Sequence, residues 1–180
     1  MTLFTANVPK AQITGFEADF TVRPSDNFQF GASGNYTNAR YTKNALSITL
    51  PPDPTNLLRY GPFADTPRFS GTFFAEASAD LGNTGRLTLR GDVYSQSKMY
   101  FTNVGDTLNA LAVLPAYTLV NAKLTLSEIM GTRLSASVSA RNLFNRKYYA
   151  GGNAANSATL PNTVNPGVPR MIMGELRFDF

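Results

Sequence analysis

An alternation of apolar and polar residues with a period of two runs through much of the chain, and it is clearest in the last ten residues, MIMGELRFDF. The charged residues of this stretch share one parity, and the large apolar residues Ile172, Leu176, Phe178 and Phe180 share the other. Because successive side chains of a β-strand point to opposite faces, the pattern predicts a strand with one apolar and one charged face, running to the last residue. The apolar face of such a strand needs a cover.

The same alternation predicts seven strands along the chain. They span residues 12–23, 28–37, 68–81, 86–99, 116–127, 132–142 and 169–180. Within the strands, the charged residues fall on the polar parity. Short turns such as PSDN (24–27) and GNTG (82–85) alternate with long loops at 38–66, 100–114 and about 143–168. We therefore expect an all-β fold, an antiparallel up-and-down meander of about seven long strands in which every connection is a hairpin.

Strand length and loop length distinguish two kinds of all-β protein. A soluble sandwich or barrel also alternates apolar and polar residues, but its strands average about 5 to 6 residues. The predicted strands are longer and match the roughly 9 to 11 tilted residues that cross a bilayer. Short turns on one side, long loops on the other and Phe or Tyr near the strand ends are typical of outer-membrane barrels. We predict a partial transmembrane β-barrel in the Gram-negative cell outer membrane, with lipid covering the apolar parity and the last strand ending at the periplasmic surface.

Composition narrows the functional classes. The chain has no Cys, His or Trp, which excludes metal sites built on thiolate or imidazole, and catalysis by Cys or Ser-His pairs, within this segment. Its net charge of +4 is scattered along strand faces without a basic cluster, so nothing supports nucleic-acid binding. We predict no enzymatic activity, no cofactor and no metal site. The start, MTLFTANVPK, lacks the features of a secretory signal, and no stretch approaches the roughly 20 apolar residues of a membrane helix.

The segment SVSARNLFNRKYYAGG (137–152) resembles the penultimate-strand motif of TonB-dependent outer-membrane receptors. In that motif an alternating strand leads into Asn-Leu-Phe, followed by a basic residue and Tyr; the matching positions are Asn142, Leu143, Phe144, Lys147 and Tyr148. Residues 7–30 resemble the recurrent strand pair of the family through a Gly-aromatic-Glu element: Gly15, Phe16 and Glu17. Residues 66–81 and 114–127 look like further strands of the same barrel in the same order.

The resemblance implies a barrel of about 22 strands, occluded by an N-terminal plug. It also implies energised uptake of iron–siderophore complexes or similar scarce nutrients through contact with the TonB complex. We expect residues 1–180 to form the C-terminal part of such a barrel, with the plug domain and the N-terminal strands absent. Three apolar residues at the end resemble the signal that the barrel-assembly machinery recognises: Leu176, Phe178 and Phe180. Two alternatives stay open: a passive porin-like outer-membrane barrel, and a soluble carbohydrate-binding β-domain.

Aromatic and basic residues in or beside the long loops are candidates for ligand contact, since loops on a rigid scaffold commonly carry recognition. They are Arg59, Tyr60, Tyr100, Tyr148 and Tyr149. Aromatic residues near a membrane interface are equally expected to form a girdle, so both interpretations stay open. The charged residues of the polar parity line a substrate path, bind the plug or form cross-strand ion pairs, and ion pairing is the favoured interpretation. For NLFNRKYY (142–149) we expect a structural role in turning the chain from strand to loop.

Overall fold

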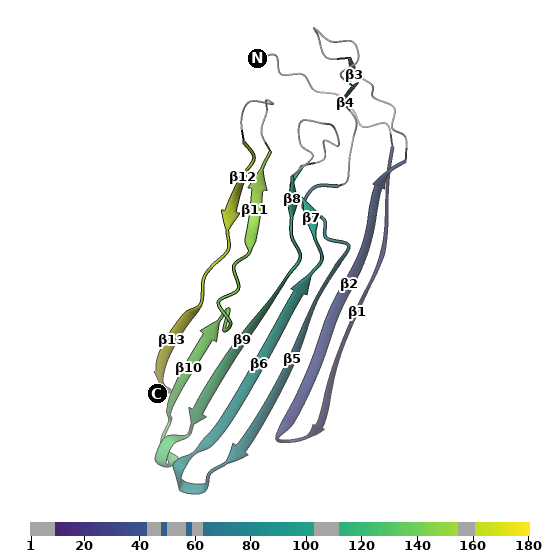
Figure 1. The fold of residues 1–180 in the computed structure, drawn as a ribbon. Helices are drawn as coiled ribbons and strands as arrows, with labels where there is room; N and C mark the ends of the chain where they lie inside the picture. Colours follow the sequence, from purple (N-terminus) through teal and green to yellow (C-terminus); the bar gives the residue numbers. More distant parts are fainter. Residues whose placement is uncertain (1–9, 43–47, 50–56, 59–62, 103–111, 155–160) are drawn as a thin grey trace.

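Seven long strands form one antiparallel sheet in the computed structural model, which describes residues 10–42, 48–49, 57–58, 63–102, 112–154 and 161–180. The order of the strands is β1-β2-β5-β6-β9-β10-β13 (Figure 1). Their bounds are β1 (Ala11–Ser25), β2 (Phe28–Tyr41), β5 (Phe69–Asp80), β6 (Arg86–Gln96), β9 (Tyr117–Ser127), β10 (Leu134–Arg141) and β13 (Met171–Phe178). Each long strand pairs with the next long strand along the chain. The predicted seven-stranded meander is therefore confirmed.

The connections differ at the two ends of the sheet, which we call the turn end and the loop end (Figure 1). At the turn end the chain reverses around Asp26 and through two single 3-10 turns, η1 (Gly82–Thr84) and η2 (Ile129–Gly131). At the loop end the long connections contain three small hairpins: β3 (Ile48–Thr49) with β4 (Leu57–Leu58), β7 (Met99–Tyr100) with β8 (Val113–Leu114), and β11 (Tyr149–Asn153) with β12 (Thr163–Pro166). We expected loops there, because β3, β4, β7 and β8 have only two residues each, and because β11 and β12 contain Gly, Asn or Pro, which weakens the strand signal.

Close packing between two turns at the turn end requires glycine at position 85. Gly85 has a φ of 121°, which an L side chain rarely adopts, and a Cβ atom built on it would collide with the carbonyl oxygen of Ser127. Ser127 ends β9, so the η1 and η2 turns lie against each other. Glycine at this position therefore allows two neighbouring hairpins to close side by side.

The register of the sheet separates the two kinds of residue onto two faces. Directly paired residues form a continuous apolar row from β2 to β10: Phe28, Ala77, Leu89, Leu124 and Val138. The positions next to these in each strand pair with one another in the same way and form a polar row: Gln29, Glu76, Arg90, Lys123 and Ser139. Because a slip of one residue would exchange the faces, this register confirms the predicted alternation across five strands at once.

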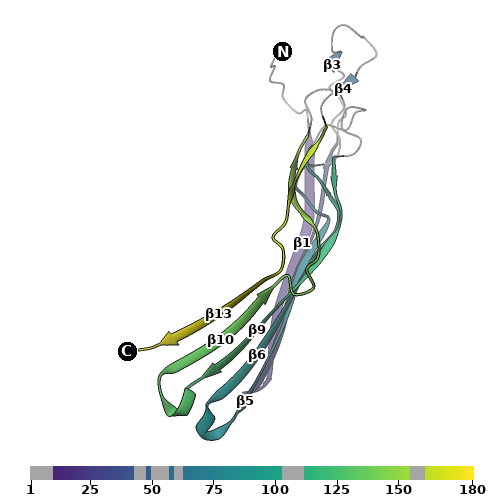
Figure 2. The same cartoon turned by 60° about the vertical axis from the view of Figure 1, so that its left-hand side comes forward.

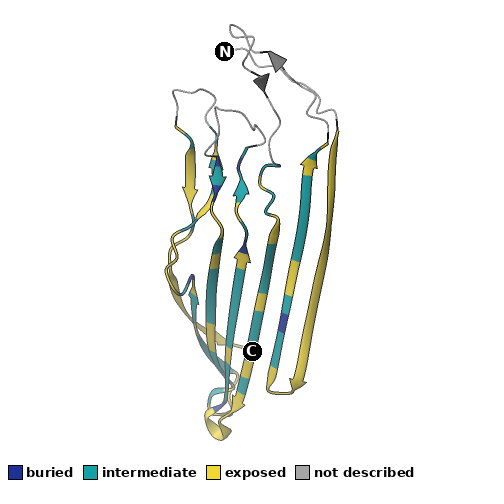
Figure 3. Ribbon diagram, turned by 45° about the vertical axis from the view of Figure 1, so that its right-hand side comes forward, coloured by how far each residue is buried: buried dark blue, intermediate teal, exposed yellow. Residues whose placement is uncertain are grey.

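The apolar face has no protein cover among the described residues. Large side chains on it are strongly exposed, including Leu89 at 55% and Val138 at 56% of their full area. The buried apolar cluster of the described chain lies instead at the loop end, where Phe101, Ala112 and Leu114 pack together. Figure 3 shows how little of the sheet is buried. A soluble sandwich covers this kind of face with a second sheet, and the described residues supply no such layer.

The sheet is curved and open (Figure 2). Its edge strands, β1 and β13, are exposed along their whole length and lie at opposite ends of the strand order. Neither edge strand pairs with a further strand in the part of the chain that the structure describes. A curved antiparallel sheet with two open edges is consistent with part of a barrel wall, as predicted. The last strand is shorter than predicted: β13 ends at Phe178, although the Asp179 amide still donates to the carbonyl oxygen of Arg133 at 3.2 Å.

Candidate functional site

Arg90 lies at the centre of the polar face and binds two carboxylates. Its Nη1 is 3.5 Å from Glu76 Oε2 on β5, and its Nη2 is 3.0 Å from Asp92 Oδ1 on its own strand. Gln29 of β2 donates from Nε2 to the other oxygen of Glu76 at 2.9 Å. The guanidinium carbon of Arg90 also lies 4.3 Å from the centre of the Phe74 ring. These residues satisfy one another across three strands, which is the cross-strand ion pairing that the sequence favoured.

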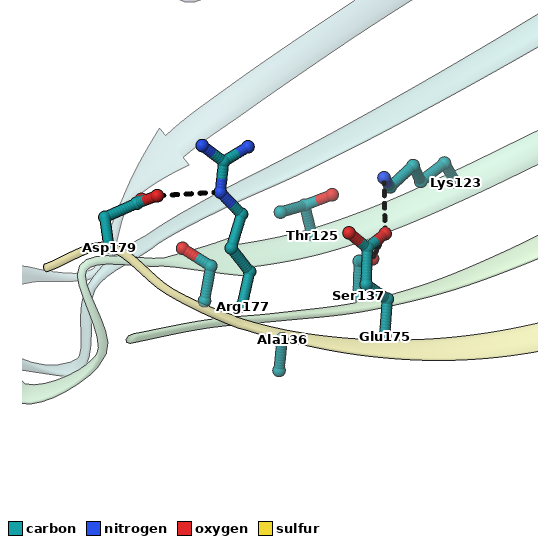
Figure 4. Close-up of a pocket in the computed structure, with 8 residues that line it drawn as sticks. Lys123, Thr125, Ala136, Ser137, Glu175, Arg177 and Asp179 are labelled. Carbon is teal, nitrogen blue, oxygen red and sulfur yellow. Dashed lines mark hydrogen bonds and ion pairs between the residues drawn. The ribbon is translucent and has the colours of Figure 1, made fainter. Parts of the chain in front are cut away.

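A second polar cluster lies on β9, β10 and β13 (Figure 4). Lys123 Nζ reaches across β10 to Glu175 Oε2 at 3.4 Å, and the Ser137 hydroxyl lies 3.5 Å from the same oxygen. Nearer the end of the chain, Arg177 Nε donates to Asp179 Oδ1 at 2.8 Å. The side chains of both ion pairs are about half exposed or more, so solvent screens them and each contributes little stability.

Two carboxylates on β1 differ from these clusters, because neither Glu17 nor Asp19 forms an ion pair within the described residues. They line a shallow pocket of about 280 Å³ together with Ser33, Asn35 and Tyr94. Both are on the polar face of an edge strand. They are therefore available to cations that do not belong to the described chain.

Asn142 closes the junction between β10, the third long loop and β13. Its side chain makes three hydrogen bonds to backbone: Nδ2 donates to the carbonyl oxygens of Arg146 at 2.9 Å and Val168 at 3.0 Å, and Oδ1 accepts from the Arg146 amide at 2.8 Å. Its own amide donates to Asn121 Oδ1 at 3.0 Å. Asn142 is only 4% exposed and has a φ of 48°. Asn tolerates this left-handed conformation better than most residues, so one residue ends the strand and fixes both sides of the loop.

A row of tyrosines follows the polar face towards the loop end. The ring centres of Tyr94 and Tyr117 are 6.0 Å apart, and those of Tyr117 and Tyr148 are 4.5 Å apart. The Tyr94 hydroxyl donates to Oε1 of Gln96 at 2.9 Å, and Gln96 is buried. These contacts join β6, β9 and the third loop into one aromatic surface.

Tyr148 is held in this row from its other side. A Cβ atom on Gly167 would collide with the Tyr148 ring, so the ring lies directly on the backbone of that glycine. The Gly167 amide donates to the Tyr148 carbonyl oxygen at 2.8 Å, and the Val168 amide donates to its hydroxyl at 3.3 Å. Tyr148 therefore packs as a structural residue between the wall and the strand that leads into β13.

A pocket of about 540 Å³ lies where β2, β5 and β6 reach the loop end. Its lining includes three cationic side chains and two aromatic ones: Arg40, Arg68, Lys98, Phe63 and Tyr100. The backbone at Tyr100 is fixed by pairing with Val113 and by the Asp65 amide, which donates to the Tyr100 carbonyl oxygen at 2.6 Å.

The sequence profile of a family described as "TonB dependent receptor-like, beta-barrel" matches residues 2–143. The chain belongs to this family. No curated protein sequence matches it significantly.

Solved structures of receptors for siderophores and ferric siderophore complexes share the fold of the described sheet. The ferric yersiniabactin uptake receptor FyuA from Yersinia pestis is 20% identical to this chain, with a TM-score of 0.74. The alignment covers 94% of this chain and 24% of the FyuA chain. The ferric preacinetobactin receptor BauA from Acinetobacter baumannii is 22% identical, with a TM-score of 0.64, and the alignment covers 94% of this chain and 22% of the BauA chain. The siderophore receptor PiuA from the same species is 14% identical, with a TM-score of 0.65, and the alignment covers 93% of this chain and 22% of the PiuA chain. These proteins are receptors rather than enzymes, and this chain spans about a quarter of their length.

The family-motif residues occupy two distant parts of this TonB-dependent receptor barrel. Gly15, Phe16 and Glu17 lie in the first strand, where the Phe16 ring is 5.9 Å from that of Tyr36. Leu143 continues the pairing of β10 by donating its amide to the Val120 carbonyl oxygen at 2.8 Å. The other matching positions in this loop are Phe144, which is 74% exposed, and Lys147, which is also exposed.

The structure separates the five candidate ligand contacts. Arg59 and Tyr60 lie outside the described residues. Tyr100 lines the pocket at the loop end, Tyr148 packs against the wall, and Tyr149 begins β11 with 44% of its area exposed. The three candidates that can be placed therefore have different environments, and the pocket includes only Tyr100 among them.

The residues of the predicted assembly signal, Leu176, Phe178 and Phe180, lie at alternate positions in and just after the edge strand β13. Leu176 is 78% exposed and Phe178 is 55% exposed. The ring centres of Phe178 and Phe180 lie 5.5 Å apart in an edge-to-face arrangement. All three side chains are accessible to a partner, and their recognition by the assembly machinery stays a prediction.

Sequence reasoning missed the roles of Asn121 and Val168 as partners of Asn142. Asn121 shares the polar parity of β9, but its hydrogen bond to the Asn142 amide depends on strand register. Val168 O is reached across the whole third loop, and no local signal indicates that contact. Within the described residues, no helix is long and apolar enough to span a membrane. The same part of the chain contains no group of three acidic, His or Cys residues arranged to bind a metal.

Proposed function

We propose that this chain is the C-terminal part of the barrel of an outer-membrane TonB-dependent receptor, and that the whole receptor takes up an iron–siderophore complex or a similar scarce nutrient. The observation that carries the proposal is the single-layer sheet with an uncovered apolar face and two unpaired edges, found in a chain of this family. Lipid covers the apolar face, and further strands pair with β1 and β13. The loop end faces the outside of the cell and the turn end faces the periplasm.

The polar face lines the lumen in this proposal, where it meets the plug. Glu17 and Asp19 are the part of the face best suited to that contact, since they have no cationic partner among the described residues. A carboxylate pair on a lumen wall favours an Arg or Lys from the plug. The plug in turn is the part of the receptor that contacts the TonB complex. The chain on its own neither binds nor transports a substrate.

The decisive experiment is an uptake assay in cells that carry the full-length receptor. Bacteria lacking the receptor gene, and the same bacteria complemented with it, are grown under iron limitation and supplied with radiolabelled ferric siderophores. We expect uptake only in the complemented cells and only when TonB is present. A stop codon at Met171 removes β13 and should abolish both assembly and uptake, because a barrel with an open seam leaves backbone groups unpaired in lipid.

The control separates energised uptake from passive diffusion. A small hydrophilic solute of porin size is supplied to the same cells with and without TonB. Solute entry that needs the receptor but not TonB would support a porin-like barrel and contradict the proposal. TonB-dependent entry of an iron complex would support it.

A further inference from the structure

Arg40 breaks the rule that separates the two faces of this barrel wall. The other charged residues of the seven long strands share the parity of the polar face. Strand β2 extends to Tyr41, beyond its predicted end at Thr37, and the extension places Arg40 on the parity of Phe28 and Tyr36, which belong to the apolar face. On the outside of an outer-membrane barrel, a cation is costly near the midplane but not near the membrane surface. The depth of Arg40 therefore decides what it contacts.

A row of aromatic side chains marks the edge of the apolar face towards the loop end. The Tyr36 ring centre lies 5.9 Å from that of Phe16 on β1 and 4.9 Å from that of Phe69 on β5. Such rows mark the boundary between hydrocarbon and headgroups. Arg40 follows four residues after Tyr36, which is roughly 13 Å along a strand and roughly 10 Å in depth at a tilt of about 40°. Arg40 therefore lies at the level of the lipid headgroups, on the side of the membrane that the loop end faces.

A second cation, Lys10, shares this part of the outer surface. The Thr42 amide donates to the Lys10 carbonyl oxygen at 3.0 Å, which continues the pairing of β1 with β2 and gives Lys10 the parity of Gln12. Gln12 pairs directly with Arg40, whose Nη2 donates to Gln12 Oε1 at 3.1 Å. Arg40 also borders the pocket at the loop end, but this bond holds its guanidinium on the outer surface. Within the described chain neither cation forms an ion pair, and the acids of β1 lie on the polar face.

The groups on this patch suit the phosphate of a lipid. A guanidinium has five donors in a planar fork that matches phosphate oxygens, and the bond to Gln12 uses one of them. Thr14 and Asn38 pair directly between the cations and the aromatic row, and supply a hydroxyl and an amide group. Cations therefore lie furthest from the membrane centre, followed by neutral polar groups and then by aromatic rings. A phosphorylated lipid presents phosphate, polar linkages and acyl chains in the same order.

We propose that Arg40 and Lys10, on the outer surface of β1 and β2, bind the phosphate group of a lipid in the outer leaflet. This inference rests on the membrane placement in the proposed function, but it concerns the outside of the wall and not the transport path. Because the site exists only when β1 and β2 are paired, a lipid that binds it also stabilises the assembled wall.

The test measures lipid binding to the full-length receptor, purified in a non-ionic detergent and titrated in a native mass spectrometer. The probes are diphosphorylated lipid A, the same glycolipid without its phosphates, and inorganic phosphate, all with EDTA so that no divalent cation bridges the contact. The test variant is Lys10→Gln combined with Arg40→Gln. The matched control is Arg68→Gln combined with Lys98→Gln, which removes the same charge at the same end of the wall but from the lining of the loop-end pocket.

We expect the phosphorylated glycolipid to bind more tightly than the dephosphorylated one. Its affinity should fall about fivefold for each cation removed, or roughly 25-fold in the test variant, and should be unchanged in the control. Equal affinities for the two glycolipids, or equal losses in the two double variants, would overturn the inference. Displacement of the glycolipid by a molar excess of inorganic phosphate would also overturn it, because the site would then bind a free anion and not a lipid.

Two single variants keep the test decisive if the double variant does not assemble, as judged by heat-modifiable migration on a gel. Arg40→Lys keeps the charge and should retain most of the binding, whereas Arg40→Gln should lose about fivefold. The same affinity in both would contradict the proposal. Failure of the unmodified receptor to bind the phosphorylated glycolipid would overturn this inference alone, whereas failure of the receptor to insert into membranes would refute the proposed function.

Discussion

Replacing Asn142 should loosen the junction between the barrel wall and its last loop. The side chain makes three hydrogen bonds to backbone groups of Arg146 and Val168 in a site that is 4% exposed. A net contribution of about 0.5 to 1.5 kcal/mol for each bond gives a loss of about 3 kcal/mol for the set. Alanine adds about 1 kcal/mol, because the φ of 48° is unfavourable for a residue with a Cβ and no polar group. We therefore expect Asn142→Ala to cost about 4 kcal/mol and Asn142→Gly, which tolerates this φ, about 3 kcal/mol.

The loss should appear as local opening rather than global unfolding, since the loop can detach while the sheet stays paired. Hydrogen–deuterium exchange of the full-length receptor in lipid measures it directly. A change of about 3 kcal/mol corresponds to roughly 100-fold faster exchange, and we expect this at the Arg146 and Val168 amides but not in β5 or β6. Asn145→Ala is the matched control: Asn145 also has a positive φ of 51°, but its side chain makes one hydrogen bond, from the Arg170 amide at 3.1 Å. Equal acceleration in Asn145→Ala and Asn142→Ala, or none in Asn142→Gly, would refute this account of the junction.

Three further predictions concern the wall. Val138→Arg puts a charge on the lipid face and should cost about 2 to 4 kcal/mol near the bilayer midplane, whereas Ser137→Arg on the polar face should cost little; equal losses on refolding into vesicles would show that the faces are assigned wrongly. Gly167→Ala should displace the ring of Tyr148, which occupies the space of the new methyl group. A crystal structure of the variant would show the displacement, and an unmoved ring would contradict the contact. Arg90→Gln should lower the unfolding free energy by about 1 kcal/mol, because its two ion pairs are partly exposed and screened; a loss of several kcal/mol in urea would mean that the network is more strongly coupled than its exposure indicates.

The faces of the sheet are predictable from sequence because the period of two is a local property of each strand. Parity placed Glu76 and Arg90 on one face, and the hairpin connection made their strands neighbours. It did not place them opposite each other, since that depends on the register of β5 against β6. The bond from Asn142 to Val168 O depends on how a long loop returns to the wall, which no local pattern encodes. The basic pocket was missed for the same reason: Arg40, Arg68 and Lys98 come from three strand ends and look scattered in the sequence.

The β7–β8 and β11–β12 hairpins were missed for a different reason. The strands of the first hairpin have only two residues each, which is too short for an alternating pattern to be recognised. The second hairpin includes residues with weak strand propensity, Gly151 and Gly152 in β11. Their pairing follows from the strands below them, which bring the two sides of each loop together and hold them antiparallel. Strand formation there is a consequence of tertiary structure rather than of propensity.

The long strands are unequal in length, and this has a mechanical consequence for the wall. β1 spans 15 residues, whereas β10 and β13 span 8 each. The force needed to shear two strands apart grows with the number of backbone hydrogen bonds that break together, so the wall is weakest at the end that contains the C-terminus. The pairing of β9 with β10 extends only from Ala136 to Ala140, whereas the pairing of β1 with β2 runs from Ala11 to Ser25. Under a shearing force, this part of the wall would therefore separate first between β9 and β10, while the hairpin of β1 and β2 stays paired.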